Sequence, residues 1–436
     1  MSESWRGDGF VAAAQLGARH HYAVPAVFHQ AGMLGRFYTD LFLSVESAAY
    51  KSLQLAGGIS GAPIIKRALG RFSRAVPRDL VTHFPTLAMR YAWERRHAAG
   101  KDAMTALHVR TGIDFNRRIV KRWSPQVRVV YSMNTASADL FEWCRANGVR
   151  SMLDQTIVDR RTEIELVAGE SRAWSGWEPA FEDSVEKELV DVELREWEAT
   201  DAILCPSVFV ADALAARGVP RHKLLMNPYG MELGHWKVDR SNRSGGELKC
   251  LFAGRVCLRK GAPYLLDAAK RLAGKNVSVR FVGPVSLTGD KLGAYRDCCE
   301  IIGAVPREQM PSQYEWADVF VLPSVCEGSA TVCYEALSAG LPVITTPNAG
   351  SWIRDGIEGY VVPARDSNAL ADRIMSLEAD RDKLRRMSDA AIELSKQFAW
   401  ERYGPRLKKI ADNLRDGVPP GEWGEIFTLP TIIGDA

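Results

Sequence analysis

Short apolar runs alternate along this chain with longer stretches in which apolar residues recur every three or four positions. GFVAAAQL (9–16), VRVVYSM (127–133) and VRSMLDQT (149–156) have the first pattern, which is typical of buried strands. A helical pattern follows several of these runs, as in ASADLFEWCRANG, which ends at Gly148. Regular alternation of strands and helices predicts an α/β fold with parallel sheets.

The alternation resumes beyond a polar segment. Residues 239–247 are rich in Gly and Ser and have no periodicity, as expected of a linker. After them, 248–272 reads as a strand, a glycine turn, a basic loop and an amphipathic helix, and 277–284 and 317–323 read as further strands. The chain is therefore expected to form two domains joined by this linker.

The predicted domains differ in layout. Residues 1–238 form the first, with a helical insertion at about 51–122, and residues 247–396 form the second. Residues 397–436 begin with an amphipathic helix. Residues 161–200 hold twelve Asp and Glu against four Lys and Arg, and they are predicted to form one long helix with a mostly solvated face.

Length and composition fit two ordinary globular domains. The chain has 436 residues, 46% hydrophobic and 25% charged, enough to bury a core in each domain. Its start, MSESWRGDGF, lacks the order of a signal peptide, and no apolar run reaches eighteen residues, so we expect a cytoplasmic protein. The eight cysteines form no CxxC pair, which argues against a cysteine metal site.

Charge is spread unevenly over the chain. The formal net charge is +3, yet residues 51–128 carry sixteen Lys and Arg against four Asp and Glu. Aromatic residues such as Trp93 lie among these charges. The pattern is compatible with peripheral contact with the anionic inner face of a membrane, with an anionic acceptor, or with a solvated helical face. Nucleic acid is a poor fit because no nucleic-acid motif accompanies the charge.

The stretch LPSVCEGSATVCYEALSAG (322–340) carries the clearest candidate chemistry. It reads as the end of a buried strand, a polar loop and a helix that closes at Gly340. A helix start offers unpaired amides to a phosphate, here near residues 328–331. Glu327 and Glu335 lie before and within this helix, and carboxylates accept paired hydrogen bonds from vicinal hydroxyls. Taken alone, the spacing favours an ordinary explanation, with Glu327 a solvated loop residue and Glu335 a partner of the helix dipole.

A second candidate lies upstream. Arg255 and Lys260 are five residues apart in the loop that follows the strand near 248–253. Ligands of open α/β sheets bind at the carboxyl ends of strands, so both cations could reach one diphosphate.

Together these residues resemble the family 4 glycosyltransferases. The order GR-x4-KG, ADVFVLPS, EG-x6-E, G-x-PVI and DG-x-x-G runs from Leu248 to about Tyr403. The resemblance implies the GT-B architecture, with two Rossmann-like doubly wound domains facing across a cleft and a C-terminal helix that crosses back to the first. It also implies retaining transfer of a sugar from a nucleotide-diphosphate sugar to a sugar, lipid-linked or other hydroxyl acceptor, in polysaccharide, glycolipid or glycoconjugate synthesis.

The resemblance assigns roles to individual residues. Arg255 and Lys260 would bind the donor diphosphate, Glu327 the donor sugar and Glu335 the ribose. Other predicted donor-binding residues are Gly17, Gly283, Val305, Gly328, Ser329, Ala330 and Thr331. No aspartate pair lies at a strand end where it would hold Mg²⁺ with the donor, so no metal or other cofactor is expected.

One position departs from the family pattern. Related enzymes commonly carry a histidine after the strand at 149–156, where this chain has Asp154 and Gln155. Either could bind a sugar or acceptor hydroxyl, and Asp154 could accept its proton.

Three other functions remain open at this point. A GT-B nucleotide-sugar epimerase would need an acid/base pair that the sequence does not reveal. A nucleotide-sugar-binding protein without catalysis would explain the missing histidine. A dehydrogenase is disfavoured because no GxGxxG followed by an acidic residue is present.

Overall fold

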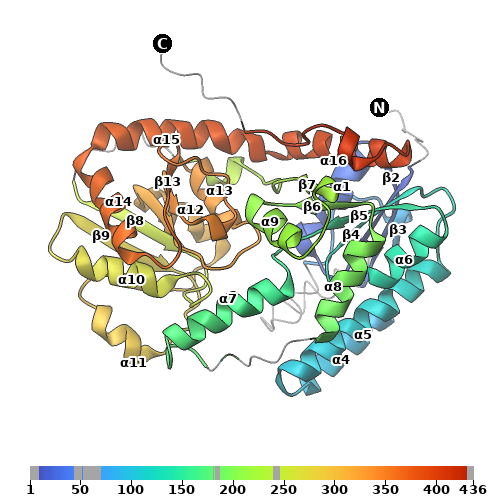
Figure 1. Ribbon diagram of the computed structural model, residues 1–436, viewed down its shortest axis with the longest axis horizontal. Coiled ribbons are helices and arrows are strands. Elements are labelled where there is room, and N and C mark those ends of the chain that lie inside the picture. Colours follow the sequence, from blue (N-terminus) through green and yellow to red (C-terminus); the bar gives the residue numbers. More distant parts are fainter. Residues whose placement is uncertain are drawn as a thin grey trace, which may run out of the picture.

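Two parallel sheets side by side form the framework of the computed structural model (Figure 1). The structure describes residues 9–43, 52, 70–179, 181, 187–238 and 246–429. The predicted linker at 239–247 lies mostly outside these residues, as does much of 51–70.

The first sheet has seven strands in the order β3-β2-β1-β4-β5-β6-β7, and the second has six in the order β10-β9-β8-β11-β12-β13. The strands of the first sheet are β1 Val11–Gln15, β2 Leu34–Thr39, β3 Val81–His83, β4 Val129–Met133, β5 Arg150–Asp154, β6 Ala202–Cys205 and β7 Leu224–Met226. Those of the second are β8 Leu248–Ala253, β9 Val277–Val282, β10 Glu300–Gly303, β11 Val319–Leu322, β12 Val343–Thr345 and β13 Gly359–Val361.

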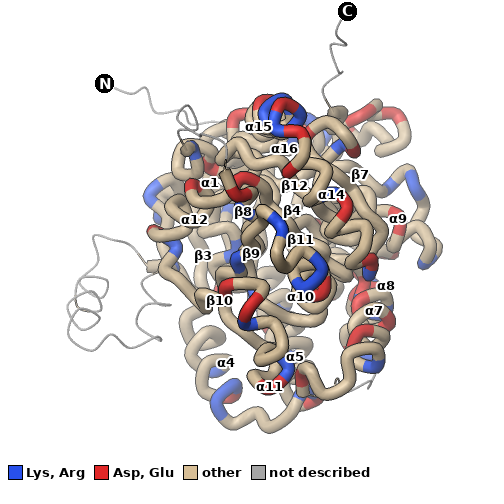
Figure 2. The backbone as a smooth tube through the Cα atoms, turned by 90° about the vertical axis from the view of Figure 1, so that its left-hand side faces the viewer, with Lys and Arg blue, Asp and Glu red and all other residues tan. Residues whose placement is uncertain are grey.

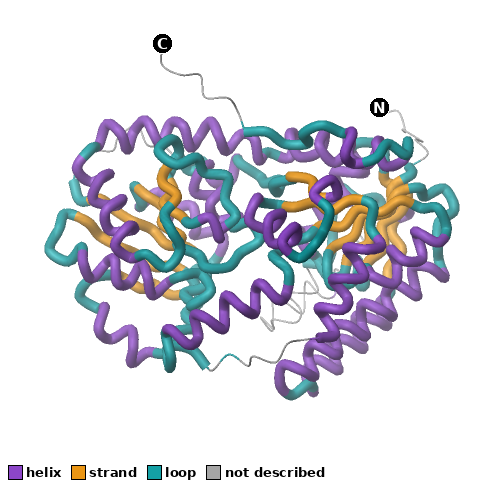
Figure 3. The backbone as a smooth tube through the Cα atoms, in the orientation of Figure 1, coloured by secondary structure: helices purple, strands orange, loops and turns teal. Residues whose placement is uncertain are grey.

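Helices cover both sheets (Figure 3). They are α1 Ala23–Gln30, α4 Pro85–His97, α5 Gly100–Lys121, α6 Ala138–Ala146, α7 Arg160–Ala173, α8 Lys187–Ala199, α9 Val208–Ala216, α10 Ala262–Arg271, α11 Gly289–Leu292, α12 Met310–Trp316, α13 Thr331–Ser338, α14 Ser367–Ala379, α15 Arg381–Ser395 and α16 Trp400–Arg415. All pairings between named strands are parallel, so each sheet gathers its strand carboxyl ends along one edge. The expected α/β fold with two doubly wound sheets is confirmed.

The final helix returns to the first sheet. α16 contacts α1, β4 and β5. Its buried Arg406 donates to Asn227 Oδ1 at 3.1 Å and to the carbonyl of Pro228 at 2.8 Å. A side chain at Gly230 would lie 2.3 Å from the Trp400 ring, so only glycine lets this turn pack on α16. The helix therefore fastens the turn between the two sheets.

The prediction of one long helix over 161–200 is wrong. The chain instead forms α7 and α8, and between them it turns at Trp174. Figure 1 shows α7 running from the first sheet toward α10 of the second. Trp174, just after α7, packs against Tyr264 of α10 with ring centroids 5.4 Å apart. The C-terminal end of α7 therefore lies against the second domain.

The expected solvated face of this segment is also only partly present. Figure 2 shows acidic residues along α7 and α8, but three of the glutamates are buried. Glu170 accepts from Tyr264 Oη at 2.8 Å and pairs with Arg365 at 2.5 Å, and both partners belong to the second domain. Glu196 accepts the amides of Thr135 and Ser137. These carboxylates are buried because hydrogen bonds compensate for the water that they lose.

Candidate functional site

The junction between β11 and α13 has the predicted strand, loop and helix. α13 begins at the exposed Thr331, and Ala330 before it provides no side-chain cap. The loop is fixed instead by the segment after β12, because the amide of Glu327 donates to Asn348 O and that of Ala330 to Ala349 O. Ser329 Oγ donates to Gly350 O at 2.9 Å. The helix start thus stays open to an anionic ligand, although the Ala330 amide is already used.

Glu327 is held by two cations. Its Oε1 lies 2.7 Å from Lys260 Nζ and 3.2 Å from Arg259 NH1. Oε1 is buried, and among the described residues no donor reaches it with hydrogen-bond geometry, so these contacts are ion pairs. Arg259 also donates to the carbonyl of Cys326 at 2.8 Å, which ties the two loops together. The structure therefore brings together Lys260 and Glu327, and it adds Arg259, which the sequence motifs do not single out.

Close backbone approaches set the position of Lys260. A Cβ at Gly261 would lie 1.9 Å from the carbonyl oxygen of Pro323, and Gly261 has a φ of 67°. At Gly283 a Cβ would lie 1.9 Å from the carbonyl oxygen of Gly254, and φ is 143°. Glycine is required at both positions because a side chain would separate the strand ends that carry the loops.

The loop between β11 and α13, residues 323–330, is called the donor loop below because the sequence predicts donor binding there. It packs against the first domain. Ser207 Oγ donates to Gly328 O at 2.5 Å. A Cβ at Gly328 would lie 2.0 Å from the carbonyl oxygen of Thr156 and 2.8 Å from Ile157 Cα. Thr156 follows β5 and Ser207 follows β6, so the carboxyl edges of both sheets meet at residues 327–329.

Arg255 lies apart from this ion-pair cluster. Its guanidinium is exposed and donates to Ser286 Oγ at 3.2 Å, in the segment after β9. It stays at the carboxyl edge of the second sheet, as predicted from its place after β8. Within the described residues it makes no ion pair with Glu327.

Glu335 lies one turn into α13 and is 8% exposed. Its Oε2 accepts from Tyr314 Oη at 2.7 Å, and its Oε1 is 3.9 Å from the Arg307 guanidinium. Burial raises the pKa of Glu335, while Tyr314 and Arg307 lower it. Val305 is half-buried and lies two residues before Arg307. The segment that carries Val305 therefore also supplies Arg307, which lies near Glu335, and the sequence motifs did not include Arg307.

Asp154 and Gln155 are both buried at the end of β5. Asp154 accepts from Tyr131 Oη and is 3% exposed. Gln155 accepts from Trp197 Nε1 at 3.1 Å and donates to Ile157 O at 2.9 Å. Asp154 would need a local movement to reach an acceptor hydroxyl, and Gln155 is already satisfied.

We predict that Asp154 makes the protein less stable as pH rises. Burial raises the pKa of Asp154 from 3.8 to about 6, against opposing effects of Tyr131 and Arg19. The folded state therefore binds this proton more tightly than the unfolded state, and stability falls as pH rises from about 4 to about 6. Relative to Asp154→Asn, the parent should lose roughly 3 kcal/mol of unfolding free energy across that window.

Chemical denaturation of both proteins at several pH values measures this difference. A difference that stays constant from pH 4 to pH 6 would contradict the account of this carboxyl. The activity of Asp154→Asn in sugar transfer tests whether Asp154 accepts the proton of the acceptor hydroxyl. If it does, the substitution should lower kcat by about a hundredfold or more.

The loop after β1 is held by other residues of the first domain. The amide of Gly17 donates to Asp40 Oδ1 at 3.0 Å, and Arg71 pairs with the same oxygen at 2.8 Å. Arg19 is exposed. Burial and the charge of Arg19 lower the pKa of His20 to about 4, so His20 is neutral near pH 7 and adds no charge to the site.

The described residues contain no group of three or more His, Cys, Asp and Glu side chains arranged to hold a metal ion. None of the helices in the same residues combines the length and apolar composition that a membrane-spanning helix needs.

Comparison with known proteins places the second domain in a family. Residues 247–380 match the family described as "Glycosyl transferases group 1". The putative colanic acid biosynthesis glycosyltransferase WcaL of Salmonella typhimurium is 26% identical over 49% of this chain and 57% of its own length. The GDP-mannose-dependent alpha-(1-6)-phosphatidylinositol monomannoside mannosyltransferase of Mycobacterium tuberculosis is 27% identical over 51% of this chain and 63% of its own. The chain spans about half the length of the curated relatives it matches.

Solved structures match nearly the whole chain. Sucrose-phosphate synthase from Thermosynechococcus elongatus has a TM-score of 0.61 at 16% identity, covering 93% of this chain and 99% of that protein. Anabaena HepE, solved in complex with UDP, has a TM-score of 0.58 at 12% identity, covering 92% and 99%. At these identities the likeness establishes the fold. The chain therefore has the GT-B fold, and its residues 247–380 match the glycosyl transferases group 1 family, in agreement with the resemblance to family 4.

Proposed function

We propose that this protein is a retaining glycosyltransferase that moves a sugar from a nucleotide-diphosphate sugar to an acceptor hydroxyl in polysaccharide or glycoconjugate synthesis. The observation that carries the proposal is the cluster of Lys260, Arg259 and Glu327 beside the uncapped start of α13. The names of the relatives support it, since colanic acid and amylovoran biosynthesis glycosyltransferases are among them.

Positive charge in this cluster suits a departing diphosphate. Transfer places negative charge on the leaving group, and fixed cations and amides stabilise such charge without reorganising. Lys260 lies beside the loop, and α13 adds the positive end of its dipole. Arg255 at the exposed edge of the sheet would reach the same diphosphate by moving away from Ser286.

Glu327 fits a role in holding the donor sugar better than a role as nucleophile. Its Oε1 is stabilised as an anion by two cations, which lowers its tendency to attack carbon. The same buried oxygen meets no aligned donor among the described residues and can accept a sugar hydroxyl. We propose that the acceptor hydroxyl attacks from the face that the diphosphate leaves, with retention of configuration.

We also propose that transfer needs no metal. The cations beside the donor loop, Lys260 and Arg259, supply the positive charge that a metal supplies in other transferases. Glu335 would bind the ribose, with Arg307 and Tyr314 keeping its carboxyl in place.

A thermal-shift panel of nucleoside diphosphates and their sugars tests the proposal. A ligand at one hundred times its Kd should stabilise the protein by about 2.7 kcal/mol. One base should stand out, EDTA should leave the shift unchanged, and Lys260→Ala should remove most of it. Lys275→Ala is the matched control, because Lys275 lies exposed in the turn after α10.

The panel also separates the alternatives. A shift with no transfer to any acceptor would favour a nucleotide-sugar-binding protein, and nucleotide release without any acceptor would favour an epimerase. No shift with any nucleotide would contradict all three GT-B functions.

Contact with an anionic membrane surface also stays a proposal. In the described part of the basic region 51–128, α4 exposes Met89 and Trp93, each to 64%, beside the exposed Arg96. Sedimentation with anionic vesicles tests this contact, and equal sedimentation with neutral vesicles would contradict it.

A further inference from the structure

A pocket of about 340 Å³ lies in the first domain, at the carboxyl ends of β1, β2 and β4. Gly17 and Arg19 follow β1, Asp40 follows β2 and Thr135 follows β4. The helices α4 and α5 complete its wall, and Figure 1 shows them side by side. The pocket is therefore built at the same sheet edge that faces the donor loop.

Positive charge exceeds negative charge in this pocket. Three arginines line it, Arg19, Arg71 and Arg95, against the single carboxylate of Asp40. Arg71 pairs with Asp40 at 2.8 Å, so these two charges compensate each other. In the part of the chain that the structure describes, no acidic side chain forms an ion pair with Arg19 or Arg95, although Arg19 interacts at longer range with Asp154.

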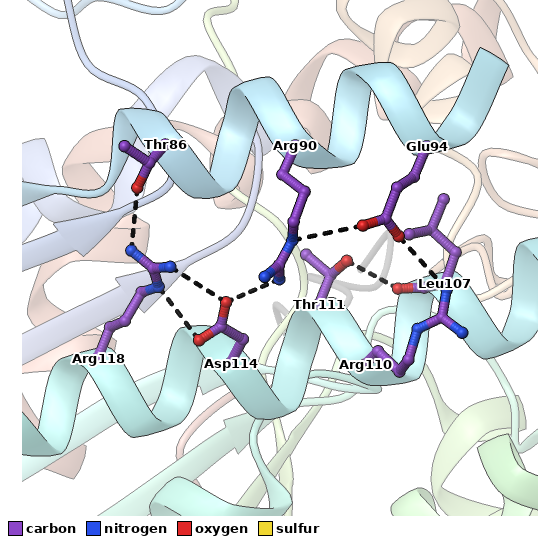
Figure 4. A network of polar contacts seen from close by, with 8 residues as sticks. All are labelled: Thr86, Arg90, Glu94, Leu107, Arg110, Thr111, Asp114 and Arg118. Carbon is purple, nitrogen blue, oxygen red and sulfur yellow. Dashed lines mark hydrogen bonds and ion pairs between the residues drawn. The ribbon is translucent and has the colours of Figure 1, made fainter. Parts of the chain in front are cut away.

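Two acidic residues of α4 and α5, Glu94 and Asp114, form ion pairs with arginines that do not line the pocket. Figure 4 shows that Asp114 pairs with Arg90 and Arg118, at 2.7 and 3.2 Å, while Glu94 pairs with Arg110 at 3.3 Å. The pairs Arg90–Asp114 and Glu94–Arg110 join α4 to α5, whereas Asp114–Arg118 lies within α5. Within the described residues, none of the ion pairs of Glu94 or Asp114 involves Arg95.

Helix geometry directs Arg95 toward the pocket. Ala88, Tyr91 and Arg95 all line it, and their spacing of three and four residues places them on one face of α4. Arg96 is the next residue, about 100° further around the helix, and it does not line the pocket. Arg95 and Arg96 therefore carry the same charge on different faces of α4, and Arg95 is the one that lines the pocket.

The loop that carries Arg19 has an unusual backbone. His20, His21 and Tyr22 all have positive φ, at 48°, 50° and 61°. Such residues cost energy and persist only where their surroundings hold them. Gln15 holds the start of this loop, because its Nε2 donates to the carbonyls of Gly17 and Arg19 at 3.1 and 2.6 Å.

A second pocket adjoins the first and reaches Ile157, which packs against Gly328. It has a volume of about 320 Å³ and shares His108, Thr135 and Leu189 with the first. It is also lined by Ile157, whose Cα lies 2.8 Å from where a Cβ of Gly328 would be. A molecule in the first pocket could thus extend toward Glu327.

We propose that the first pocket binds the acceptor and that the acceptor carries an anionic group, a phosphate or a carboxylate, held by Arg19 and Arg95. This inference rests on the proposed function and specifies its substrate class. Guanidinium groups bind both kinds of anion through paired, charge-assisted hydrogen bonds. Tyr91 Oη, which is 2.7 Å from His108 Nε2, and Thr111 Oγ1, which donates to Leu107 O at 2.7 Å, lie in the same wall. Each hydroxyl oxygen would accept a further hydrogen bond from the sugar part of the acceptor.

Calorimetric titration of the full chain tests the proposal with three probes that share one hexose ring and differ at carbon 6: glucose 6-phosphate, glucuronate and glucose. The nucleoside diphosphate with the largest thermal shift is present at saturation, so that the donor site is filled. At least one anionic probe should bind about tenfold more tightly than glucose, and Arg95→Ala should weaken that binding about tenfold. Arg95→Lys should retain part of the affinity, and Arg96→Ala should leave it unchanged.

Binding of only one anionic probe would support the proposal and identify the group as phosphate or carboxylate. The proposal is overturned if glucose binds as tightly as both anions, or if Arg95→Ala and Arg96→Ala give equal affinities. Failure here, with the nucleoside diphosphate still bound, would leave the proposed function intact. Failure of every nucleotide to bind would contradict the proposed function whatever the anionic probes do.

Discussion

Lys260→Ala is expected to lower the kcat of sugar transfer by a hundredfold or more, because it removes about 3 kcal/mol of stabilisation from the departing diphosphate. Lys260 Nζ lies 2.7 Å from Glu327 and beside the strand end at Gly254. Its loss also leaves Glu327 with Arg259 as its remaining partner. Steady-state kinetics with saturating donor and acceptor measure the effect.

Lys275→Ala should retain full activity, and a Lys260→Ala, Glu327→Gln double variant should lose less than the product of the two single effects. The two side chains touch, so their contributions are coupled. Near-normal turnover in Lys260→Ala would show that this cluster does not carry the chemistry.

Gly261→Ala is expected to destabilise the second domain by about 3 kcal/mol or more and to lower activity as well. Its Cβ would lie 1.9 Å from the carbonyl oxygen of Pro323, and Gly261 has a φ of 67°. The overlap is with backbone, which cannot rotate away, so the two loops must separate. Thermal and chemical denaturation measure the change.

Gly274→Ala separates the steric effect from the backbone effect. Gly274 has a φ of 78°, close to that of Gly261, but nothing lies within 4 Å of its Cβ position. Its substitution should cost only about 1 kcal/mol, the strain of a left-handed residue. Equal destabilisation by the two substitutions would contradict the close approach of the two loops.

Apolar runs made much of the fold predictable. The predicted strands near 127–133, 149–156 and 317–323 correspond to β4, β5 and β11, since each is a short run buried on both faces. The strands β2, β3 and β10 were not predicted. β2 contains Gly35 and Arg36, and β3 has only three half-buried residues, so neither has the apolar pattern of a central strand.

The closeness of Lys260 and Glu327 was predictable because both residues follow strands, and the carboxyl ends of neighbouring parallel strands lie at one sheet edge. Lys260 and Glu327 meet because glycine lets the loops after β8 and β11 touch. Arg259 was missed because sequence spacing does not show that two adjacent cations both contact the glutamate. Arg307 and Tyr314 were missed because strand pairing of β10 brings them to Glu335.

The first domain's site could not be predicted from local pattern. Asp154 follows an apolar run as any strand-end polar residue does, and its burial depends on Tyr131, Tyr229 and Tyr403 from distant segments. The burial of Glu170 likewise requires partners on the other domain. Such long-range packing leaves no signal in hydrophobic periodicity.

An experimental structure with the nucleoside diphosphate selected by the thermal-shift panel would show where the diphosphate binds. We predict a terminal phosphate within hydrogen-bond distance of Lys260 Nζ and of the Thr331 amide at the start of α13, with the ribose on Glu335. A diphosphate bound on the first domain, away from Lys260 and α13, would contradict this prediction.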